Sequence, residues 1–346
     1  MKKKLEFSVF NCAVILMLVI GCNKEQPVNS LSQELKFSAP RAGTPTTFPK
    51  LISSSGEKGG RISAVPIGSQ LFAFAGSNLF RIHTDDRSYS VIGVDWNGTE
   101  AATIMSGYLF AVQGGHLWRC DLSSTNCVDL GAAWGGTSSL TNDGSFLYGI
   151  QGGRIWKVNF NGGWAQLGNG SWRAGWIACN RSTNPPSLLV TQPDGFWWQV
   201  NTSNGSWVNR FGNDVWPYVF PDPPSATLLG QPGMFAVSLF NQRPIVAKRV
   251  PPSSIGANDY IAPGDLTSYS TARDIAWTSY GNTSKSIWVL NGDQIFQLTA
   301  NINAFNYFPM GATITGLSGV YQIVSQHLAT ILEVCLAHKY MAFLHG

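Results

Sequence analysis

The chain has 346 residues, and only 12% of them carry a charged side chain, whereas glycine occurs 37 times and tryptophan 13 times. This composition suits many short strands joined by tight turns and fits a helical bundle poorly, so an all-β fold is expected. The net charge of +4 is too small for a nucleic-acid partner, and the five histidines lack metal-ligand spacing, so neither a metal nor a cofactor is expected.

The first 21 residues are typical of a signal peptide. A basic start is followed by a largely apolar run at residues 7–20, which is shorter than the roughly 20 residues needed to cross a bilayer as a helix. The sequence Val19-Ile20-Gly21-Cys22 is similar to the lipobox of bacterial lipoproteins, in which cleavage before the cysteine exposes it for acylation. An ordinary secretory or membrane-anchor segment with a chance cysteine is the alternative.

Residues 22–59 are predicted to be a lipidated cysteine followed by a flexible stalk. This stretch is rich in proline, serine, threonine and glycine and has little apolar periodicity. One acyl chain binds membranes only marginally, whereas two or more anchor stably, so the multiply acylated Cys22 that the lipobox implies would hold the protein at a membrane. We therefore expect an exported lipoprotein of the bacterial envelope, at the outer membrane or cell surface.

Residues 60–324 contain an internal repeat of about 40 residues. Three copies lie 38 residues apart in succession: LFAFAGSNLFRI at 71–82, LFAVQGGHLWRC at 109–120 and LYGIQGGRIWKV at 147–158. Three looser copies begin at Leu188, Met234 and Ile287, so that six can be counted.

Each copy is predicted to form four strands. Two alternating apolar runs flank a glycine-containing turn, and glycine supplies the positive φ that such turns need. A phrase in which glycine precedes tryptophan by three or four residues comes next, and a short strand leads into the following copy. Four antiparallel strands per roughly 40 residues is typical of a propeller blade, and the units carry too many turns for a solenoid. The sequence thus predicts a β-propeller with six recognisable blades.

The C-terminal part departs from the repeat. Residues 312–324 align with residues 102–112 and open a partial, altered seventh repeat, but residues 325–346 lack the glycine turn and the aromatic strand. Either six blades close with a strand supplied by the opposite end of the chain, or a seventh blade was lost by truncation or a frameshift near His327.

Two cysteines lie at the ends of one predicted hairpin. Cys120 and Cys127 flank a turn rich in serine and asparagine between two strand-like segments, so they can face each other across the hairpin. Because export permits disulfides, a Cys120–Cys127 bridge is expected, with two buried free thiols as the alternative. Cys179 and Cys335 have no evident partner.

The recurring aromatic residues form two sets. One set lies inside strands, is expected to pack between blades and is given no ligand role: Phe80, Trp118, Trp156, Trp198 and Phe296. The other set ends the glycine–tryptophan phrase, in a loop or at a strand edge: Trp96, Trp134, Trp172 and Trp216. Residues able to hydrogen-bond accompany this second set: Asp95, Asn97, Thr137, Arg173 and Asp214.

The repeat also resembles a known family. The order of an aliphatic-aromatic strand, a glycine turn, the phrase LWRCD or IWKVN, a polar turn and a Leu-Gly phrase with tryptophan resembles the tectonin family of β-propeller lectins. The resemblance covers residues 57–218 well and residues 219–320 weakly, and it implies a carbohydrate ligand. A sugar has an apolar C–H face and a rim of hydroxyls, so the second tryptophan set and its polar neighbours are candidate glycan contacts. The alternative is that these tryptophans are repeated core anchors.

No recognisable catalytic motif occurs, and the acidic residues Asp85, Asp86 and Asp121 are most simply turn formers. We therefore expect a lectin without catalytic activity, which binds a glycan or glycoconjugate through several weak sites that act together. The alternative is a non-catalytic scaffold that uses the same face to bind a protein partner in the envelope.

Overall fold

A computed structural model describes residues 49–52, 70–84, 86–172, 176–180, 185–191, 197–209, 226–229, 235–240, 243–247, 260–261, 272–280, 284–301, 306–314 and 316–325. These residues belong to one unit of the chain, residues 34–346. The regular elements within them are all β-strands, and no helix long and apolar enough to cross a membrane occurs there. The expected signal peptide, Cys22, Arg173, Asp214, Trp216, Cys335 and residues 326–346 lie outside the described residues.

The strands form antiparallel sheets, which we number 1 to 6 in chain order. Sheet 1 has the order β1 (Lys50–Leu51), β4 (Tyr89–Val94), β3 (Asn78–His83), β2 (Gln70–Ala75) and β25 (Val320–Ser325). Sheet 2 contains β5 (Thr99–Met105), β6 (Tyr108–Gln113), β7 (His116–Asp121) and β8 (Cys127–Ala132). Sheet 3 contains β9 (Thr137–Asn142), β10 (Leu147–Gln151), β11 (Arg154–Val158) and β12 (Trp164–Gln166).

The other three sheets each have four strands. Sheet 4 contains β13 (Trp176–Asn180), β14 (Ser187–Thr191), β15 (Trp197–Asn201) and β16 (Trp207–Asn209). Sheet 5 contains β17 (Ala226–Leu229), β18 (Phe235–Phe240), β19 (Arg243–Ala247) and β20 (Tyr260–Ile261). Sheet 6 contains β21 (Ala272–Tyr280), β22 (Ser284–Asn291), β23 (Gln294–Asn301) and β24 (Asn306–Thr313).

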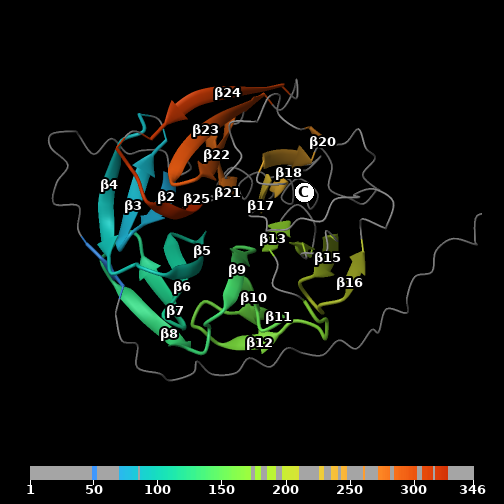
Figure 1. Cartoon of the computed structure of the whole chain (residues 1–346). Helices are drawn as coiled ribbons and strands as arrows, with labels where there is room; N and C mark the ends of the chain where they lie inside the picture. Colours follow the sequence, from blue (N-terminus) through green and yellow to red (C-terminus); the bar gives the residue numbers. More distant parts are fainter. Residues whose placement is uncertain are drawn as a thin grey trace, which may run out of the picture. The chain divides into compact units, whose positions relative to one another are not determined.

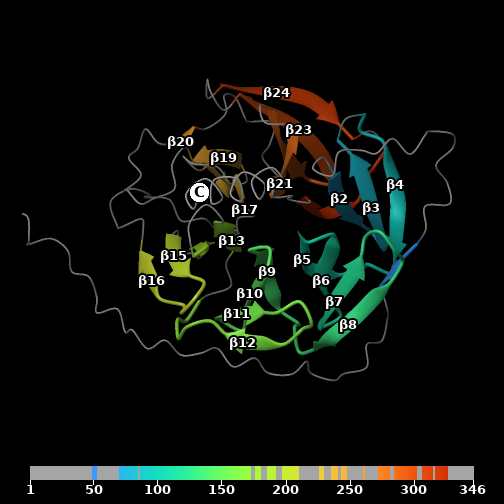
Figure 2. The ribbon, with the colours of Figure 1, turned by 180° about the vertical axis from the view of Figure 1, so that it is seen from behind.

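The first strands of sheets 2 to 6 contact one another in succession, and β25 of sheet 1 contacts the strands at both ends of that succession. β5 contacts β9, β9 contacts β13, β13 contacts β17, and β17 contacts β21; β25 contacts both β21 and β5. Figures 1 and 2 show the sheets following one another around a common centre in this order. The prediction of an all-β fold built from four-stranded antiparallel units of a β-propeller type is therefore confirmed.

Glycine turns set the register of the hairpins. Gly114 and Gly115 connect β6 to β7 with φ angles of 58° and 77°, and Gly152 and Gly153 connect β10 to β11 with 58° and 71°. Positive φ at both central residues is what a two-residue hairpin turn requires, because its twist then matches that of the strands. Because these turns require glycine, the Gly-Gly pairs mark the positions of the hairpin turns in the sequence.

The last described strand joins the first sheet. β25 pairs antiparallel with β2, so that Phe72 lies opposite Val324 and Ala73 lies opposite Ile323. The side chains of Val320 and Ile323 are buried in the core. The backbone N–H of Ile323 also donates to Asp274 Oδ2 at 2.7 Å. Residues near the end of the chain thus complete the sheet that residues 70–94 begin.

A short strand outside the repeats covers the opposite edge of sheet 1. Lys50 and Leu51, which the sequence analysis placed in the stalk, pair with β4 as β1. Leu51 is buried, and the carbonyl of Lys50 accepts a hydrogen bond from Trp96 Nε1 at 3.2 Å. Two residues carry no periodic pattern, which is why the sequence did not reveal this strand.

Cationic side chains connect successive sheets at equivalent positions. Arg81 donates to the carbonyl of Leu122 at 2.9 Å, Arg119 donates to that of Phe160 at 2.8 Å, and Lys157 donates to that of Thr202 at 3.1 Å. The guanidinium of Arg119 also lies 4.4 Å from the centre of the Phe160 ring. Burial lowers the pKa of Lys157, and the Asp143 carboxylate opposes that shift. These three cations recur at the repeat spacing because each one binds its sheet to the next sheet.

Candidate binding pocket

The tryptophans that end the glycine–tryptophan phrases are core residues. Trp96 is 0% exposed, Trp134 is 5% exposed and Trp172 is 3% exposed. The backbone N–H of each one donates to the turn of the preceding hairpin, at Ser77, Gly115 and Gly153, over 2.7–2.9 Å. A sugar platform needs an open ring face, so the platform role expected for Trp96, Trp134 and Trp172 is corrected to that of anchors.

The glycine in the phrase serves the same packing. A Cβ atom on Gly93 would lie 2.4 Å from Nε1 of Trp96, and one on Gly170, two residues before Trp172, would lie 2.7 Å from Nε1 of that tryptophan. The indole therefore covers a backbone position that has no room for a side chain. A Cβ atom on Gly168, the glycine four residues before Trp172, would instead lie 2.6 Å from the carbonyl oxygen of Gly205. The Gly-Trp signal that suggested a recurring ligand site thus has a steric cause within the core.

The polar neighbours of Trp96 do not surround an open ring. The side chains of Asp95 and Asn97 are exposed, but their backbone carbonyls accept hydrogen bonds from Nε2 of the buried Gln113. Thr137 is buried, and its hydroxyl donates to the carbonyl of Trp134. The structure therefore places Asp95 and Asn97 beside Trp96, but it is their backbone carbonyls, bonded to the buried Gln113, that hold this loop in place.

An aromatic pair recurs on the two outer strands of several sheets. Ring centroids lie 5.7 Å apart in Phe80–Tyr89, 5.0 Å apart in Trp156–Trp164 and 4.8 Å apart in Trp198–Trp207, and every pair meets edge to face. The outer-strand members occupy the same register position, opposite Ile82, Val158 and Val200. The sequence analysis did not single out these outer-strand members, because their spacing from the inner aromatic residue is not constant.

Sheet 2 has a disulfide where sheets 1, 3 and 4 have the outer aromatic residue. Cys127 lies opposite Cys120 in the β7–β8 register, and the structure joins the two sulfurs, with Cα atoms 4.0 Å apart. A covalent cross-strand link thus replaces an aromatic side chain at this position.

We predict that a non-reduced digest of the protein contains one pair of linked peptides that carry Cys120 and Cys127, because the hairpin places the two cysteines directly opposite each other. Mass spectrometry before and after reduction checks this. Alkylation of both thiols in protein that was never reduced is the opposite result.

One pocket lies between the end of β8 and strands β10–β12. Its volume is about 420 Å³, within the range of small-ligand sites. The residues that line it are Ala132, Ala133, Trp134, Gly135, Gln151, Trp156 and Trp164. Trp156 and Trp164 are partly exposed, and their ring planes are 81° apart. The sequence analysis expected Trp156 only to pack between blades, but in the structure this side chain also lines the pocket.

Hydrogen bonds fix the polar wall of the pocket. Gln151 Nε2 donates to the carbonyls of Ala133 and Gly135 at 2.6 and 3.2 Å, and Trp156 Nε1 donates to the carbonyl of Gln151 at 3.1 Å. Gln151 Oε1 has no hydrogen-bond donor among the described residues. Arg154 lies two residues before Trp156, on the same face of β11, and its Nη1 donates to Gln166 Oε1 at 3.1 Å. The amide is thus held in place with one acceptor left for a ligand.

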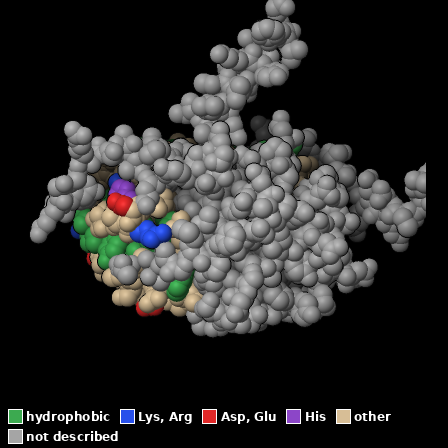
Figure 3. All heavy atoms as spheres, turned by 90° about the horizontal axis from the view of Figure 1, so that it is seen from above, with side chains coloured by type: hydrophobic (Ala, Val, Ile, Leu, Met, Phe, Trp, Pro, Cys, Tyr) green, Lys and Arg blue, Asp and Glu red, His purple; other side chains and the backbone are tan. Residues whose placement is uncertain are grey.

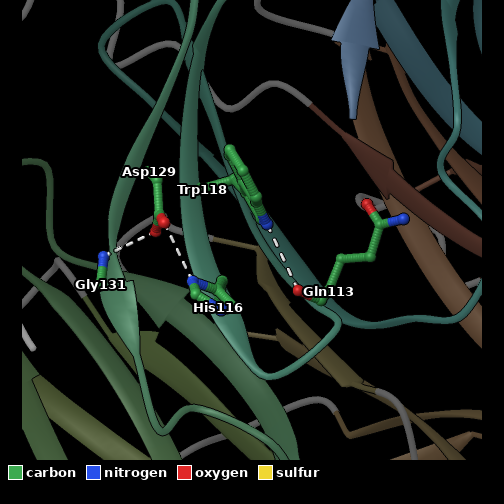
Figure 4. Close-up of polar contacts among 5 residues, drawn as sticks. All are labelled: Gln113, His116, Trp118, Asp129 and Gly131. Atoms are coloured by element: carbon green, nitrogen blue, oxygen red, sulfur yellow. Dashed lines mark hydrogen bonds and ion pairs between the residues drawn. The ribbon is translucent and has the colours of Figure 1, made fainter. Parts of the chain in front are cut away.

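Sheet 2 shows the same framework with different polar residues (Figure 4). Trp118 Nε1 donates to the carbonyl of Gln113 at 3.3 Å, as Trp156 does to Gln151. His116 Nδ1 lies 2.9 Å from Asp129 Oδ2, and Asp129 Oδ1 accepts the N–H of Gly131 at 2.8 Å. His116 and Asp129 therefore hold the places of Arg154 and Gln166. No cluster of three metal-ligating side chains occurs in the described part of the chain.

Two of the aspartates form turns, as predicted. Asp86 Oδ1 accepts the N–H of Ser88 at 2.9 Å, and Asp121 Oδ1 accepts the N–H of Ser123 at 2.8 Å. Hydrogen bonds from the serine hydroxyls, followed by those from the backbone, lower the pKa of both carboxyls. On the face shown in Figure 3, the charged side chains that are described are few, and one acidic side chain touches a histidine.

Comparison with known proteins supports the fold alone. No family model and no curated protein matches the chain. A chain of the crystallised nidogen/laminin complex is similar at 9% identity with a TM-score of 0.52, over 74% of this chain and 97% of that one. A protein of unknown function from Bacteroides caccae has 11% identity and a TM-score of 0.48, over 74% and 98% of the two chains. The first likeness agrees with a β-propeller-like architecture.

Proposed function

We propose that this protein binds a glycan or glycoconjugate in the pocket of Trp134, Trp156 and Trp164 and does not transform it. The observation that carries this proposal is the partly exposed, edge-to-face Trp156–Trp164 pair beside a fixed amide. Indole faces suit the C–H face of a sugar, and Gln151 Oε1 is placed to accept a hydrogen bond from a hydroxyl. The tectonin resemblance of the repeats supports the same ligand class.

A second aromatic cluster supports binding at more than one place. Trp172, Trp198 and Trp207 correspond to Trp134, Trp156 and Trp164 in the next sheet, and the Trp172 ring lies 6.2 and 6.3 Å from its two neighbours. Trp207 is 40% exposed and so offers a surface to a ligand. Several weak sites on one surface bind a multivalent glycan more strongly than any one of them does.

We also propose that the propeller has six blades and that β25 closes it, in preference to a seven-bladed propeller that has lost one blade. The pairing of β25 with β2 supports this, because a strand from the C-terminal end then completes the N-terminal sheet. The contacts of β25 with both β5 and β21 agree with closure at this point. Residues 320–325 thereby serve the first blade instead of opening another, whereas residues 312 and 313 end β24 of sheet 6.

The proposed location is the bacterial envelope, where a lipid on Cys22 would present the pocket to surface glycans. Replacing Cys22 with alanine is expected to release the protein from the membrane or leave it unprocessed, because the acyl acceptor is lost. Membrane fractionation together with the mass of the mature N-terminus measures both effects. A variant that fractionates with the membrane and has the N-terminal mass of the wild type would reject the lipid anchor.

A broad glycan panel probed with the full-length protein tests the binding proposal. Retention on one or a few related glycans is expected, without any change in the mass of the glycan. Absence of binding across the panel would favour the non-catalytic envelope scaffold. The exposed apolar side chains on outer strands, Val128 at 44% and Val208 at 46%, are the observation that supports that second candidate.

A further inference from the structure

We infer that the pocket between β8 and β10–β12 takes a quaternary ammonium group of the choline type, carried as a substituent by its ligand. This inference rests on the proposed binding function and names the chemical group that occupies the pocket. A trimethylammonium group can come from a substituted glycan or from a lipid headgroup, and the two sources share the same recognition chemistry.

The aromatic walls give the first argument. Two of the tryptophans that line the pocket, Trp156 and Trp164, are partly exposed, and tryptophan ring faces attract cations more strongly than those of tyrosine or phenylalanine. The rings of Trp156 and Trp164 meet edge to face at 81°, so the ring faces of these two lining residues lie nearly at right angles to each other. Aromatic cages of this kind are the usual way in which proteins bind choline and methylated ammonium groups.

The hydrogen-bonding groups give the second argument. Trp156 Nε1 is already used by the carbonyl of Gln151, and Gln151 Nε2 is used by the carbonyls of Ala133 and Gly135. These indole and amide N–H groups are engaged, while carbonyl oxygens gather at the same wall. A quaternary ammonium has no N–H to satisfy and is attracted by such partial negative charges, so it suits this lining.

The charges around the pocket give the third argument. None of the lining side chains carries a formal charge, so nothing inside the pocket repels a cation. Arg154 stands on the same face of β11 as Trp156, but it is exposed and its guanidinium is bound to Gln166 Oε1. Solvent and salt screen an exposed charge of this kind, and its removal should strengthen cation binding.

Calorimetric titration of the full chain with choline tests the inference. The Cys22→Ala background removes any lipid from the measurement. Choline should bind about tenfold more tightly than 3,3-dimethyl-1-butanol, the neutral isostere that has the same shape and no charge. Equal or tighter binding of the neutral isostere would overturn the inference, because shape and apolar contact alone would then explain the affinity.

Three variants assign the effect to the pocket. Trp164→Leu keeps an apolar side chain but removes the ring, and it should weaken choline binding about tenfold in a protein that still unfolds cooperatively well above the assay temperature. Tyr89→Ala removes the equivalent aromatic residue of sheet 1 and should leave choline affinity unchanged. Arg154→Gln should strengthen choline binding two- to threefold at low salt, on the order expected for one exposed charge. Equal choline affinity in the wild type and Trp164→Leu contradicts the inference.

Two further probes separate the sources and the two proposals. Retention on polysaccharide beads substituted with phosphocholine, and not on vesicles of phosphatidylcholine, assigns the group to a glycan. Retention on the vesicles alone keeps the quaternary ammonium inference and rejects the glycan proposal. Conversely, binding of unsubstituted glycans that depends on Trp164, with no affinity for choline, keeps the glycan proposal and rejects the ammonium group.

Discussion

Replacing Trp172 with alanine should lower the free energy of unfolding by about 3–5 kcal/mol, the cost of deleting a large aromatic side chain from a packed core. The ring is 3% exposed and meets Trp198 and Trp207 edge to face. Its backbone N–H is bonded to Gly153, so the chain stays in place and the cavity cannot simply collapse. We therefore expect a large loss of stability.

Chemical denaturation of the wild type and the variant measures this difference. Trp207→Ala is the matched control, because the same residue type is removed from the same cluster where it is 40% exposed. The control should cost clearly less than Trp172→Ala, since less buried surface is lost. If the two variants lost equal stability, the assignment of Trp172 as a core anchor would be wrong.

Replacing Ile323 with alanine should cost about 2–5 kcal/mol, the usual range for truncating a buried isoleucine. Ile323 is 4% exposed and lies in β25, opposite Ala73 of β2. It packs in the core cluster that joins sheet 1 to sheet 6, which includes Trp288 and Leu290. The substitution therefore removes packing between sheet 1 and sheet 6, the first and last sheets in chain order.

Ser318→Ala, at an exposed position just before β25, is the control and should stay within about 0.5 kcal/mol of the wild type. Denaturant midpoints of the three proteins give the comparison. An Ile323→Ala variant as stable as Ser318→Ala would contradict the role of β25 in closing sheet 1, and with it the proposed six-bladed closure.

Features that repeat in sequence could be predicted, because they follow from backbone requirements. The Gly114-Gly115 and Gly152-Gly153 turns need positive φ, and strand alternation marks the core face, so the four-stranded units were visible from residues alone. The pairing of β25 with β2 could not be predicted, because two strands that pair from distant parts of the chain leave no local pattern in the sequence. Sequence analysis left this point open between two alternatives.

The candidate site was predicted less well, because recurrence alone does not separate core from surface. Trp96 and Trp172 recur as expected, yet they recur because the fold buries an indole against a glycine. Trp164 lines the pocket, but a single outer-strand aromatic residue after a variable turn carries no periodic signal. The position of Trp164 in the pocket follows only from the β11–β12 register, which sets this residue diagonally across from Trp156.

The affinity of the full-length protein for a glycan that it binds, compared among the wild type, Trp164→Leu and Tyr89→Ala, tests the central proposal most directly. Because one stacking contact contributes about 0.5–1.5 kcal/mol, Trp164→Leu should bind about two- to tenfold more weakly while it still unfolds cooperatively above the assay temperature, and Tyr89→Ala should bind like the wild type. Equal glycan affinity in the wild type and Trp164→Leu would contradict the assignment of this pocket as the carbohydrate site.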